Sequence, residues 1–162
     1  MALLNTGDPF PALSVTVPGG ETLTLPDALA GSYGVVLVYR GAFCPYCNAQ
    51  LRAFQRAHER LEELGVRVVA LSVDDEETTR DLVEKGGIEF PVGYGADAAE
   101  VAAATGAFRN ADPVHLQSTG FVLDPEGRTV VAVYSTGAIG RLVPEDVIGL
   151  VRHRRQRETA QA

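Results

Sequence analysis

The sequence predicts an α/β fold in which a central mixed β-sheet is flanked by helices. Residues 35–39 form a continuous apolar run, typical of a strand buried on both faces, and residues 66–73 are predicted as a second buried strand. Each run is followed by a segment with the pattern of a helix, so strand, helix, strand and helix alternate. The chain then closes with two further strands and a last helix. This order predicts parallel strands joined by right-handed crossovers, with an antiparallel pair added to them.

The first residues predict an extension of this core, over residues 1–33. Residues 13–17 and 21–25 alternate between apolar and polar side chains around a Pro-Gly-Gly turn, which predicts a hairpin. One helical turn is expected after it, over residues 26–29. We expect the extension and the core to form a single domain of residues 1–162, because this length suits one core better than two.

The remaining elements follow from apolar periodicity and from residues that begin or end helices. A long helix is expected from Pro45 to about Leu64, where Gly65 ends it. Asp74 is expected to cap the next helix. The other expected elements are a helix over residues 76–85, a short strand at 90–92, a helix over 98–105 capped by Asp97, a loop over 107–117, a hairpin of residues 120–124 and 128–135, and a final helix from Pro144 with Val147, Leu150 and Val151 facing inward.

Both cysteines of the chain, Cys44 and Cys47, stand where the first buried strand meets the long helix. Pro45 suits the first helical position, because a missing N–H costs nothing there. Cys44 therefore lies at the helix N-terminus, where free N–H groups and the helix dipole favour a thiolate. Cys47 follows one turn later, close enough for a disulfide. We interpret the pair as a redox dithiol in which Cys44 attacks and Cys47 resolves the product.

Other roles for two cysteines remain as alternatives. A zinc site is disfavoured, because the chain has no further cysteine and its histidines show no ligand spacing, so no metal is expected. The two thiols are also compatible with small core residues or with a structural clip, although so short a loop adds little stability. A CxxC pair between a strand and a helix favours the redox interpretation.

Composition excludes several classes of partner. The net charge of −7 argues against a nucleic-acid partner, and no stretch is long and apolar enough to suggest a membrane span. The basic run at residues 152–157 is interpreted as a solvated helix end. No signal peptide is recognised at the start, so a cytoplasmic location is expected.

Residues 39–51 read Tyr-Arg-Gly-Ala-Phe-Cys-Pro-Tyr-Cys-Asn-Ala-Gln-Leu. This run resembles the active-site motif of the peroxiredoxin-like branch of the alkyl hydroperoxide reductase/thiol-specific antioxidant family, within the thioredoxin superfamily. Residues 7–13 and 120–127 are similar to other segments of that family. The resemblance implies a thioredoxin-like fold and an antioxidant enzyme that reduces peroxides through a dithiol/disulfide cycle at Cys44 and Cys47. It implies no cofactor, an external reductant of the thioredoxin, glutaredoxin or low-molecular-weight thiol type, and a homodimer as a common assembly.

The chain departs from the family pattern at three positions. Typical peroxiredoxins have a proline seven residues, and a threonine or serine three residues, before the attacking cysteine, where this chain has Leu37 and Gly41. The arginine that helps to hold the peroxide would fall near Ser118, which is not an arginine. These departures leave two alternatives open: a glutaredoxin- or thioredoxin-type disulfide reductase with little peroxide activity, and a redox-sensing module that is not an enzyme.

Several neighbours of the dithiol are candidate supporting residues. Arg40 is the best candidate for a cation that stabilises the thiolate. Phe43 is expected to form an apolar wall beside Cys44, and the Tyr46 phenol is expected to be exposed. The hydroxyls of two later residues are placed where the sheet approaches the sulfurs. The full supporting set is Arg40, Gly41, Phe43, Pro45, Tyr46, Ser118 and Thr119.

Other residues could reach the dithiol, as Arg109, His115 and Arg141 could from their loops, but a structural or surface position is favoured for each. Asn48 and Gln50 are interpreted as solvated positions of the helix, whereas Tyr39 is expected in the core. Arg109, His115 and Arg141 are interpreted as surface residues of loops, and His58 as a half-buried histidine on the apolar stripe of the long helix.

Overall fold

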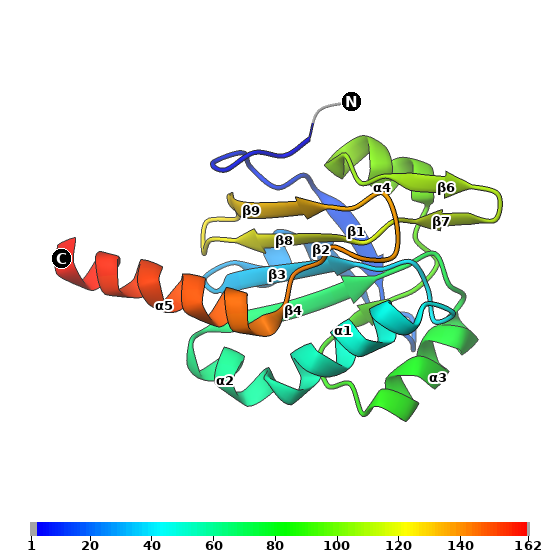
Figure 1. Ribbon diagram of the computed structural model, residues 1–162, viewed down its shortest axis with the longest axis horizontal. Coiled ribbons are helices and arrows are strands. Elements are labelled where there is room, and N and C mark those ends of the chain that lie inside the picture. The colour runs from blue at the N-terminus through cyan, green and yellow to red at the C-terminus, as the bar shows by residue number, and fades with distance from the viewer. Residues whose placement is uncertain (1–2, 162) are drawn as a thin grey trace.

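A five-stranded mixed sheet with the strand order β5-β4-β3-β8-β9 runs through the centre of the molecule (Figure 1). It is seen in a computed structural model that describes residues 3–161. Strands β3, β4 and β5 are parallel, β8 runs antiparallel to β3, and β9 runs antiparallel to β8. The strands are β3 (Tyr33–Val38), β4 (Val66–Leu71), β5 (Val92–Gly93), β8 (Thr119–Leu123) and β9 (Thr129–Tyr134). The predicted mixed α/β architecture is confirmed.

The central strand β3 is apolar throughout because both faces of the sheet are covered. All six of its residues are buried. Val35 and Leu37 belong to one hydrophobic cluster, whereas Val36 and Val38 belong to a second cluster on the opposite face. The alternation of side chains along a strand therefore divides one apolar run between two cores.

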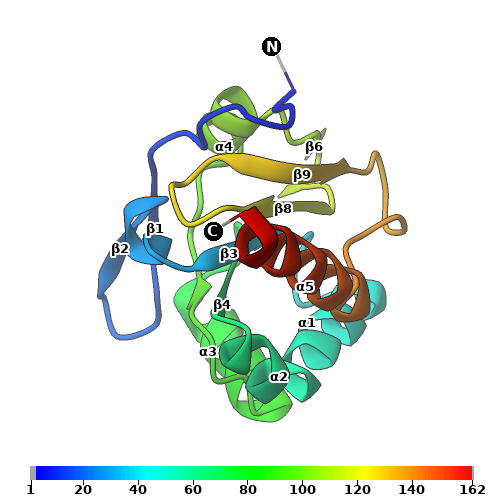
Figure 2. The same ribbon diagram turned by 90° about the vertical axis from the view of Figure 1, so that its left-hand side faces the viewer.

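Helices cover one face, and helix α4 with the N-terminal hairpin covers the other (Figure 2). The first face packs against α1 (Pro45–Arg56), α2 (His58–Glu63) and α5 (Pro144–Gln161), with α3 (Glu76–Gly86) beside α1. The second face packs against α4 (Ala98–Thr105) and the predicted hairpin of β1 (Leu13–Thr16) and β2 (Thr22–Leu25), which a short 3₁₀ turn, η1 (Asp27–Leu29), follows. The hairpin is confirmed, and the single domain of residues 1–162 stays a prediction.

Two predicted helix boundaries are wrong. The long helix from Pro45 to Leu64 is broken at Ala57, which separates α1 from α2. The bend keeps Ala57 itself buried and lets the apolar stripe continue across the junction onto the sheet. The cap of α3 is Asp75 and not Asp74, because the Asp75 side chain accepts the N–H of Thr78 at 2.8 Å.

The segment expected as a loop over residues 107–117 contains a small hairpin, so this prediction is also wrong. Its strands are β6 (Arg109–Ala111) and β7 (Val114–Leu116), and they form a separate two-stranded sheet. The hairpin follows α4 and leads directly into β8 (Figure 1). No helix within residues 3–161 is long and apolar enough to cross a membrane.

Candidate functional site

The turn between β3 and α1 brings Cys44 to the start of the helix. Gly41 adopts a φ of +150° in this turn. A Cβ atom at this position would lie 2.7 Å from the Phe43 ring and 3.0 Å from Oδ1 of Asp74. Only glycine satisfies both the backbone angle and the close approach. Gly41 therefore contributes to the site through the backbone conformation of this turn.

Two side chains from other elements fix this turn. The Asp74 carboxylate accepts the N–H of Ala42 at 2.8 Å, which explains why it is not free to cap α3. Asn48 donates from Nδ2 to the carbonyl of Ala42 at 3.0 Å. Asn48 is therefore not the purely solvated position that the sequence suggested. The turn is therefore held by Asp74, in the segment after β4, and by Asn48, in the first turn of α1.

Cys44 is the N-cap residue of α1, as the sequence predicts. Its Sγ accepts the backbone N–H of Cys47 at 3.3 Å. Pro45 occupies the first helical turn. Cys44 is 1% exposed and Cys47 is 0% exposed, and both are free thiols. Both sulfurs are thus shielded from bulk solvent and lie at the positive end of the helix dipole.

Arg40 contacts both cysteines. Its backbone N–H donates to Sγ of Cys47 at 3.4 Å, and its Nη1 lies 3.8 Å from Sγ of Cys44. Its Nε donates to Oε1 of Gln117 at 3.0 Å, which orients the guanidinium. Gln117 was missed in the sequence, where no local pattern connects it to Arg40.

A second arginine reaches the dithiol from the opposite end of the chain. Nη2 of Arg141 lies 3.6 Å from Sγ of Cys47, and its Nη1 donates to Oε1 of Gln50 at 2.8 Å. Gln50 is buried and donates from Nε2 to the carbonyl of Leu142 at 2.9 Å. The expectations that Arg141 is a surface residue and Gln50 a solvated one are therefore wrong. The loop between β9 and α5 folds back over α1, and this long-range contact buries Gln50 and partly buries Arg141.

The two thiols have pKa values shifted in opposite directions. Burial raises the pKa of Cys44, but hydrogen bonds from the Cys47 thiol and N–H and from Arg40 outweigh it, so its pKa is lowered overall. Burial, together with the hydrogen bond to Cys44, raises the pKa of Cys47. Cys44 is therefore the better thiolate of the pair, and Cys47 the better thiol.

Neither hydroxyl predicted near the sulfurs is hydrogen-bonded to one within residues 3–161. The Thr119 hydroxyl donates to the carbonyl of Gln117 at 3.0 Å, and Thr119 alternates with Gly120 and Val122, so it lies on the same sheet face as Phe121, away from the dithiol. Ser118 is buried, and no hydrogen bond joins its hydroxyl to either sulfur within residues 3–161. Gln117, one residue earlier, makes the contact to the site.

Aromatic side chains lie around the turn between β3 and α1. Phe43 is 61% exposed, and its ring lies edge-to-face with His115 at a centroid distance of 5.3 Å. The guanidinium carbon of Arg40 lies 5.4 Å from the centroid of the same ring. Tyr46 is 54% exposed, as expected. His115 is buried, so its interpretation as a surface residue is wrong, because β7 folds it onto Phe43.

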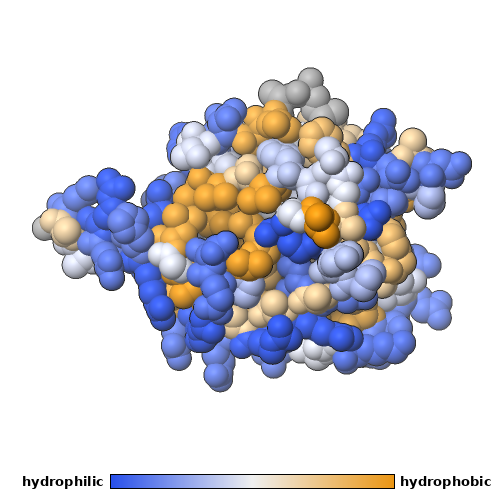
Figure 3. All heavy atoms as spheres, viewed as in Figure 1, coloured by the Kyte–Doolittle hydropathy of each residue, from blue (hydrophilic) through white to orange (hydrophobic). Residues whose placement is uncertain are grey.

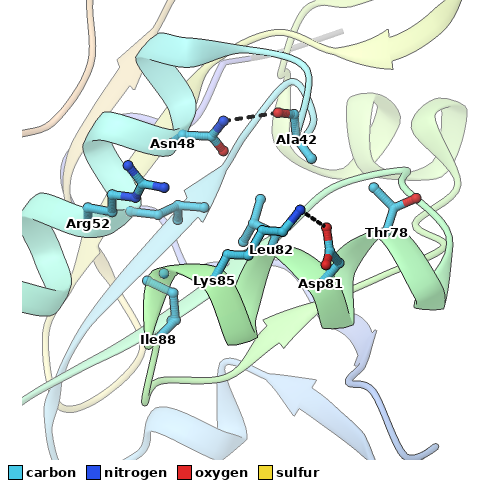
Figure 4. A pocket seen from close by; sticks show the side chains of 10 residues that line it. Ala42, Asn48, Arg52, Thr78, Asp81, Leu82, Lys85 and Ile88 are labelled. Carbon is cyan, nitrogen blue, oxygen red and sulfur yellow. Dashed lines mark hydrogen bonds and ion pairs between the residues drawn. The ribbon is translucent and has the colours of Figure 1, made fainter.

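A groove lies beside the site, between α1 and α3, with a volume of about 250 Å³ (Figure 4). Asn48 and Ala42 form its edge toward the turn, and Figure 4 shows Lys85 paired with Asp81 on the α3 side. Neither cysteine lines it. Residues 3–161 contain no cluster of three or more His, Cys, Asp or Glu side chains arranged to hold a metal ion.

Comparison with known proteins identifies the family. Residues 6–132 match the AhpC/TSA family. The peroxiredoxin of Methanothermobacter thermautotrophicus is 32% identical over 152 residues, which cover 90% of this chain and 71% of the relative. The peroxiredoxin of Treponema denticola is 31% identical over 147 residues, which cover 87% of this chain and 69% of the relative.

Solved structures agree on the fold. Enterococcus faecalis AhpC superposes with a TM-score of 0.81 at 17% identity, covering 99% of this chain and 98% of that one. Peroxidoxin BcpB of Mycobacterium tuberculosis superposes with a TM-score of 0.80 at 19% identity, covering 93% of this chain and 97% of that one. Fold and sequence family thus point the same way. The chain belongs to the AhpC/TSA family and is a thiol-dependent peroxidase of the peroxiredoxin type.

Proposed function

We propose that Cys44 is the thiolate that attacks the peroxide and that Cys47 is the cysteine that resolves the product. One observation carries the proposal: Sγ of Cys44 accepts the N–H of Cys47 at 3.3 Å and lies 3.8 Å from Nη1 of Arg40. Both contacts favour negative charge on this sulfur. Sγ of Cys47 also has a backbone N–H and a guanidinium beside it, from Arg40 at 3.4 Å and Arg141 at 3.6 Å. Burial first, and its hydrogen bond to Cys44 second, nevertheless raise the pKa of Cys47.

The first step oxidises Cys44. Its thiolate sulfur forms a bond to one peroxide oxygen, and the O–O bond breaks. Cys44 becomes a sulfenic acid, and the departing oxygen leaves as hydroxide or alkoxide, which takes a proton from water. The guanidinium of Arg40 stays beside the sulfur throughout this step. The peroxide is thereby reduced to water or an alcohol.

The second step closes a disulfide. Cys47 attacks the oxidised sulfur of Cys44, its proton goes to the departing hydroxide, and water leaves. The Arg141 guanidinium, 3.6 Å from Sγ of Cys47, favours the charge that develops on this sulfur. Because the two cysteines lie within one helical turn, the step needs little rearrangement of the helix.

An external thiol must then reduce the disulfide. We infer a reductant of the thioredoxin, glutaredoxin or low-molecular-weight thiol class, because thiol–disulfide exchange at the Cys44–Cys47 bond restores both thiols. A cytoplasmic location follows from the same requirement, since that compartment maintains a pool of reducing thiols. Cell fractionation combined with thiol trapping tests the location.

We also propose a homodimer as the assembly. Strand β9 is an edge of the central sheet. Val131 and Val133 on this strand, and Leu150 on α5, are only partly buried. Figure 3 shows apolar side chains gathered on this face of the molecule beside the base of α5. The N-terminal segment hydrogen-bonds the start of this edge at Thr129 and Val130. A strand edge next to an apolar surface is a common interaction site. Sedimentation velocity distinguishes a dimer from a monomer.

Rapid mixing of the fully reduced protein with hydrogen peroxide tests the activity assigned to Cys44. The chain has only two cysteines, so loss of thiols reports on this pair alone. We expect oxidation much faster than that of free cysteine, an intramolecular disulfide as product, and loss of the fast reaction in Cys44→Ser. A reaction that remains fast in Cys44→Ser contradicts the assignment.

A further inference from the structure

His115 is the most deeply buried histidine within residues 3–161, and it is only 6% exposed. Neither of its ring nitrogens has a hydrogen-bond partner in the described part of the chain. Buried polar groups are nearly always hydrogen-bonded, and an unpaired one in a native fold calls for a functional explanation. The imidazole therefore offers hydrogen-bonding capacity that the protein itself does not use.

The position of the ring connects it to the dithiol. Its ring lies 5.3 Å, centroid to centroid, from the ring of Phe43, the residue next to Cys44. Arg40 packs over that same Phe43 ring at 5.4 Å and also reaches Sγ of Cys44. Phe43 therefore links His115 to Arg40, and Arg40 in turn reaches Cys44.

The electrostatic surroundings keep this imidazole neutral. Burial lowers the pKa of His115, the positive charge of Arg40 lowers it further, and the nearby backbone of Pro113 opposes them, so that the pKa is lowered overall. A neutral imidazole carries one N–H donor and one acceptor nitrogen. It can donate a hydrogen bond to an oxygen that gains negative charge, without itself giving up a proton.

Building on the function proposed above, we propose that His115 contacts the peroxide and donates an N–H hydrogen bond to the departing oxygen. During the attack the S–O bond forms and the O–O bond breaks, so sulfur is oxidised and the peroxide is reduced. Negative charge develops on the departing oxygen, which then takes its proton from water. The imidazole stabilises this charge in the transition state and is unchanged afterwards.

The two arginines of the site already contact the sulfurs. Arg40 contacts Gln117 and Cys44, and Arg141 contacts Gln50 and Cys47. Nε of Arg141 also has no hydrogen-bond partner among the described residues, but both ring nitrogens of His115 lack one.

Two reactions of Cys44 separate contact with the peroxide from an effect on the thiolate. Hydrogen peroxide loses an oxygen leaving group, whereas iodoacetamide loses iodide and needs no such hydrogen bond. We would measure both second-order rate constants for His115→Phe, which preserves the aromatic packing on Phe43, and for His115→Gln, which restores a side-chain donor. Both variants are made in the Cys47→Ser background, so that only one thiol reacts.

The expected result is a loss of peroxide rate by about tenfold or more in His115→Phe, the size of one lost hydrogen bond to a charged group, with alkylation within about twofold of the parent. His115→Gln is expected to recover part of the peroxide rate. His58→Phe, a half-buried histidine of α2 beside Glu62, is the matched control and should change neither rate. An unchanged peroxide rate, or a parallel loss of both rates, overturns the role of His115. Loss of peroxide activity in the parent itself would instead overturn the proposed function.

Discussion

At the scale of single residues, Cys44 and Cys47 show how one helix turn can give two thiols opposite character. Both are buried, which raises the pKa of each. Each sulfur has a backbone N–H and a guanidinium beside it. The difference lies in the hydrogen bond between the two thiols, which lowers the pKa of Cys44 and raises that of Cys47. The spacing in the sequence predicts that the N-terminal cysteine is the thiolate. The second cation, Arg141, comes from a loop nearly a hundred residues away, and nothing local in the sequence indicates it.

The role of Arg40 is tested by Arg40→Met. Removal of the guanidinium takes away a hydrogen bond and a positive charge, so the pKa of Cys44 should rise by roughly one unit. Titration of thiolate absorbance at 240 nm in the Cys47→Ser background measures this. Arg52→Met, which removes an exposed arginine of helix α1, is the matched control. Equal pKa values for the two variants would contradict a thiolate-stabilising role.

Gly41 stands where typical peroxiredoxins have threonine or serine, and the structure predicts that restoring threonine is harmful. Its φ of +150° disfavours any side chain, and a Cβ would meet the Phe43 ring at 2.7 Å. We expect Gly41→Thr to lower the free energy of unfolding by about 1–3 kcal/mol and to slow peroxide reduction. Gly137→Ala, where a Cβ meets no atom within 4 Å, is the control. A faster and equally stable Gly41→Thr protein would show that this account of the turn is wrong.

At the scale of elements, the strand–turn–helix unit that carries the dithiol could be predicted because its signals are local. The apolar run of β3, Pro45 at the helix start and the stripe through Leu51 and Phe54 all lie within one stretch of chain. The break at Ala57 could not be predicted, because the apolar stripe continues across it. What bends the helix there is tertiary packing, which sequence periodicity does not report.

The hairpin of β6 and β7 shows a second limit of prediction from sequence. Each strand has only three residues, too few for alternation to be recognised. This element nevertheless buries His115 against Phe43 and leads to Gln117, which contacts Arg40. The candidate site was therefore predicted where it depends on neighbours in sequence. It was missed where it depends on a short strand or a returning loop.

Gln50 is the link between α1 and the returning loop. It accepts from Arg141 and donates to the carbonyl of Leu142. Gln50→Leu leaves both partners unsatisfied, and we expect it to lower the free energy of unfolding by about 1–3 kcal/mol in a denaturant titration. Gln156→Leu on the exposed face of α5 should change that energy by less than about 0.5 kcal/mol. Equal effects of the two substitutions would show that the Gln50 link is not stabilising.

At the scale of the whole molecule, one sheet separates two hydrophobic clusters and presents the dithiol beyond one end of β3. The N-terminal hairpin supplies Leu13, Val15 and Leu25 to one of these clusters. We propose on this basis that residues 1–162 form one domain, with residues 1–33 as an extension that completes its core. The mixed architecture was predictable from the order of elements, since alternation of strands and helices restricts the topology.

The dithiol also links the stability of the fold to pH. The lowered pKa of Cys44 gives stability that is complete above the unfolded thiol pKa of about 8.5 and is lost as pH falls through the folded pKa of Cys44. The raised pKa of Cys47 acts in the opposite direction, and its contribution is lost as pH rises through the folded pKa of Cys47. The unfolding free energy of the reduced protein, relative to Cys44→Ser/Cys47→Ser, should therefore rise toward pH 8.5 and fall beyond it. A difference that does not vary with pH would contradict these shifts.

The most direct test of the central claim is to follow Cys47→Ser after one equivalent of hydrogen peroxide. This variant keeps the proposed attacking thiol and lacks the resolving one. Its product is read by mass spectrometry after treatment with dimedone, which labels sulfenic acids. We expect rapid loss of the Cys44 thiol and a dimedone adduct on Cys44, while the unmodified chain forms the Cys44–Cys47 disulfide and no adduct. A Cys47→Ser protein that fails to react, or an unmodified chain that accumulates the adduct, would contradict the assignment of the two cysteines.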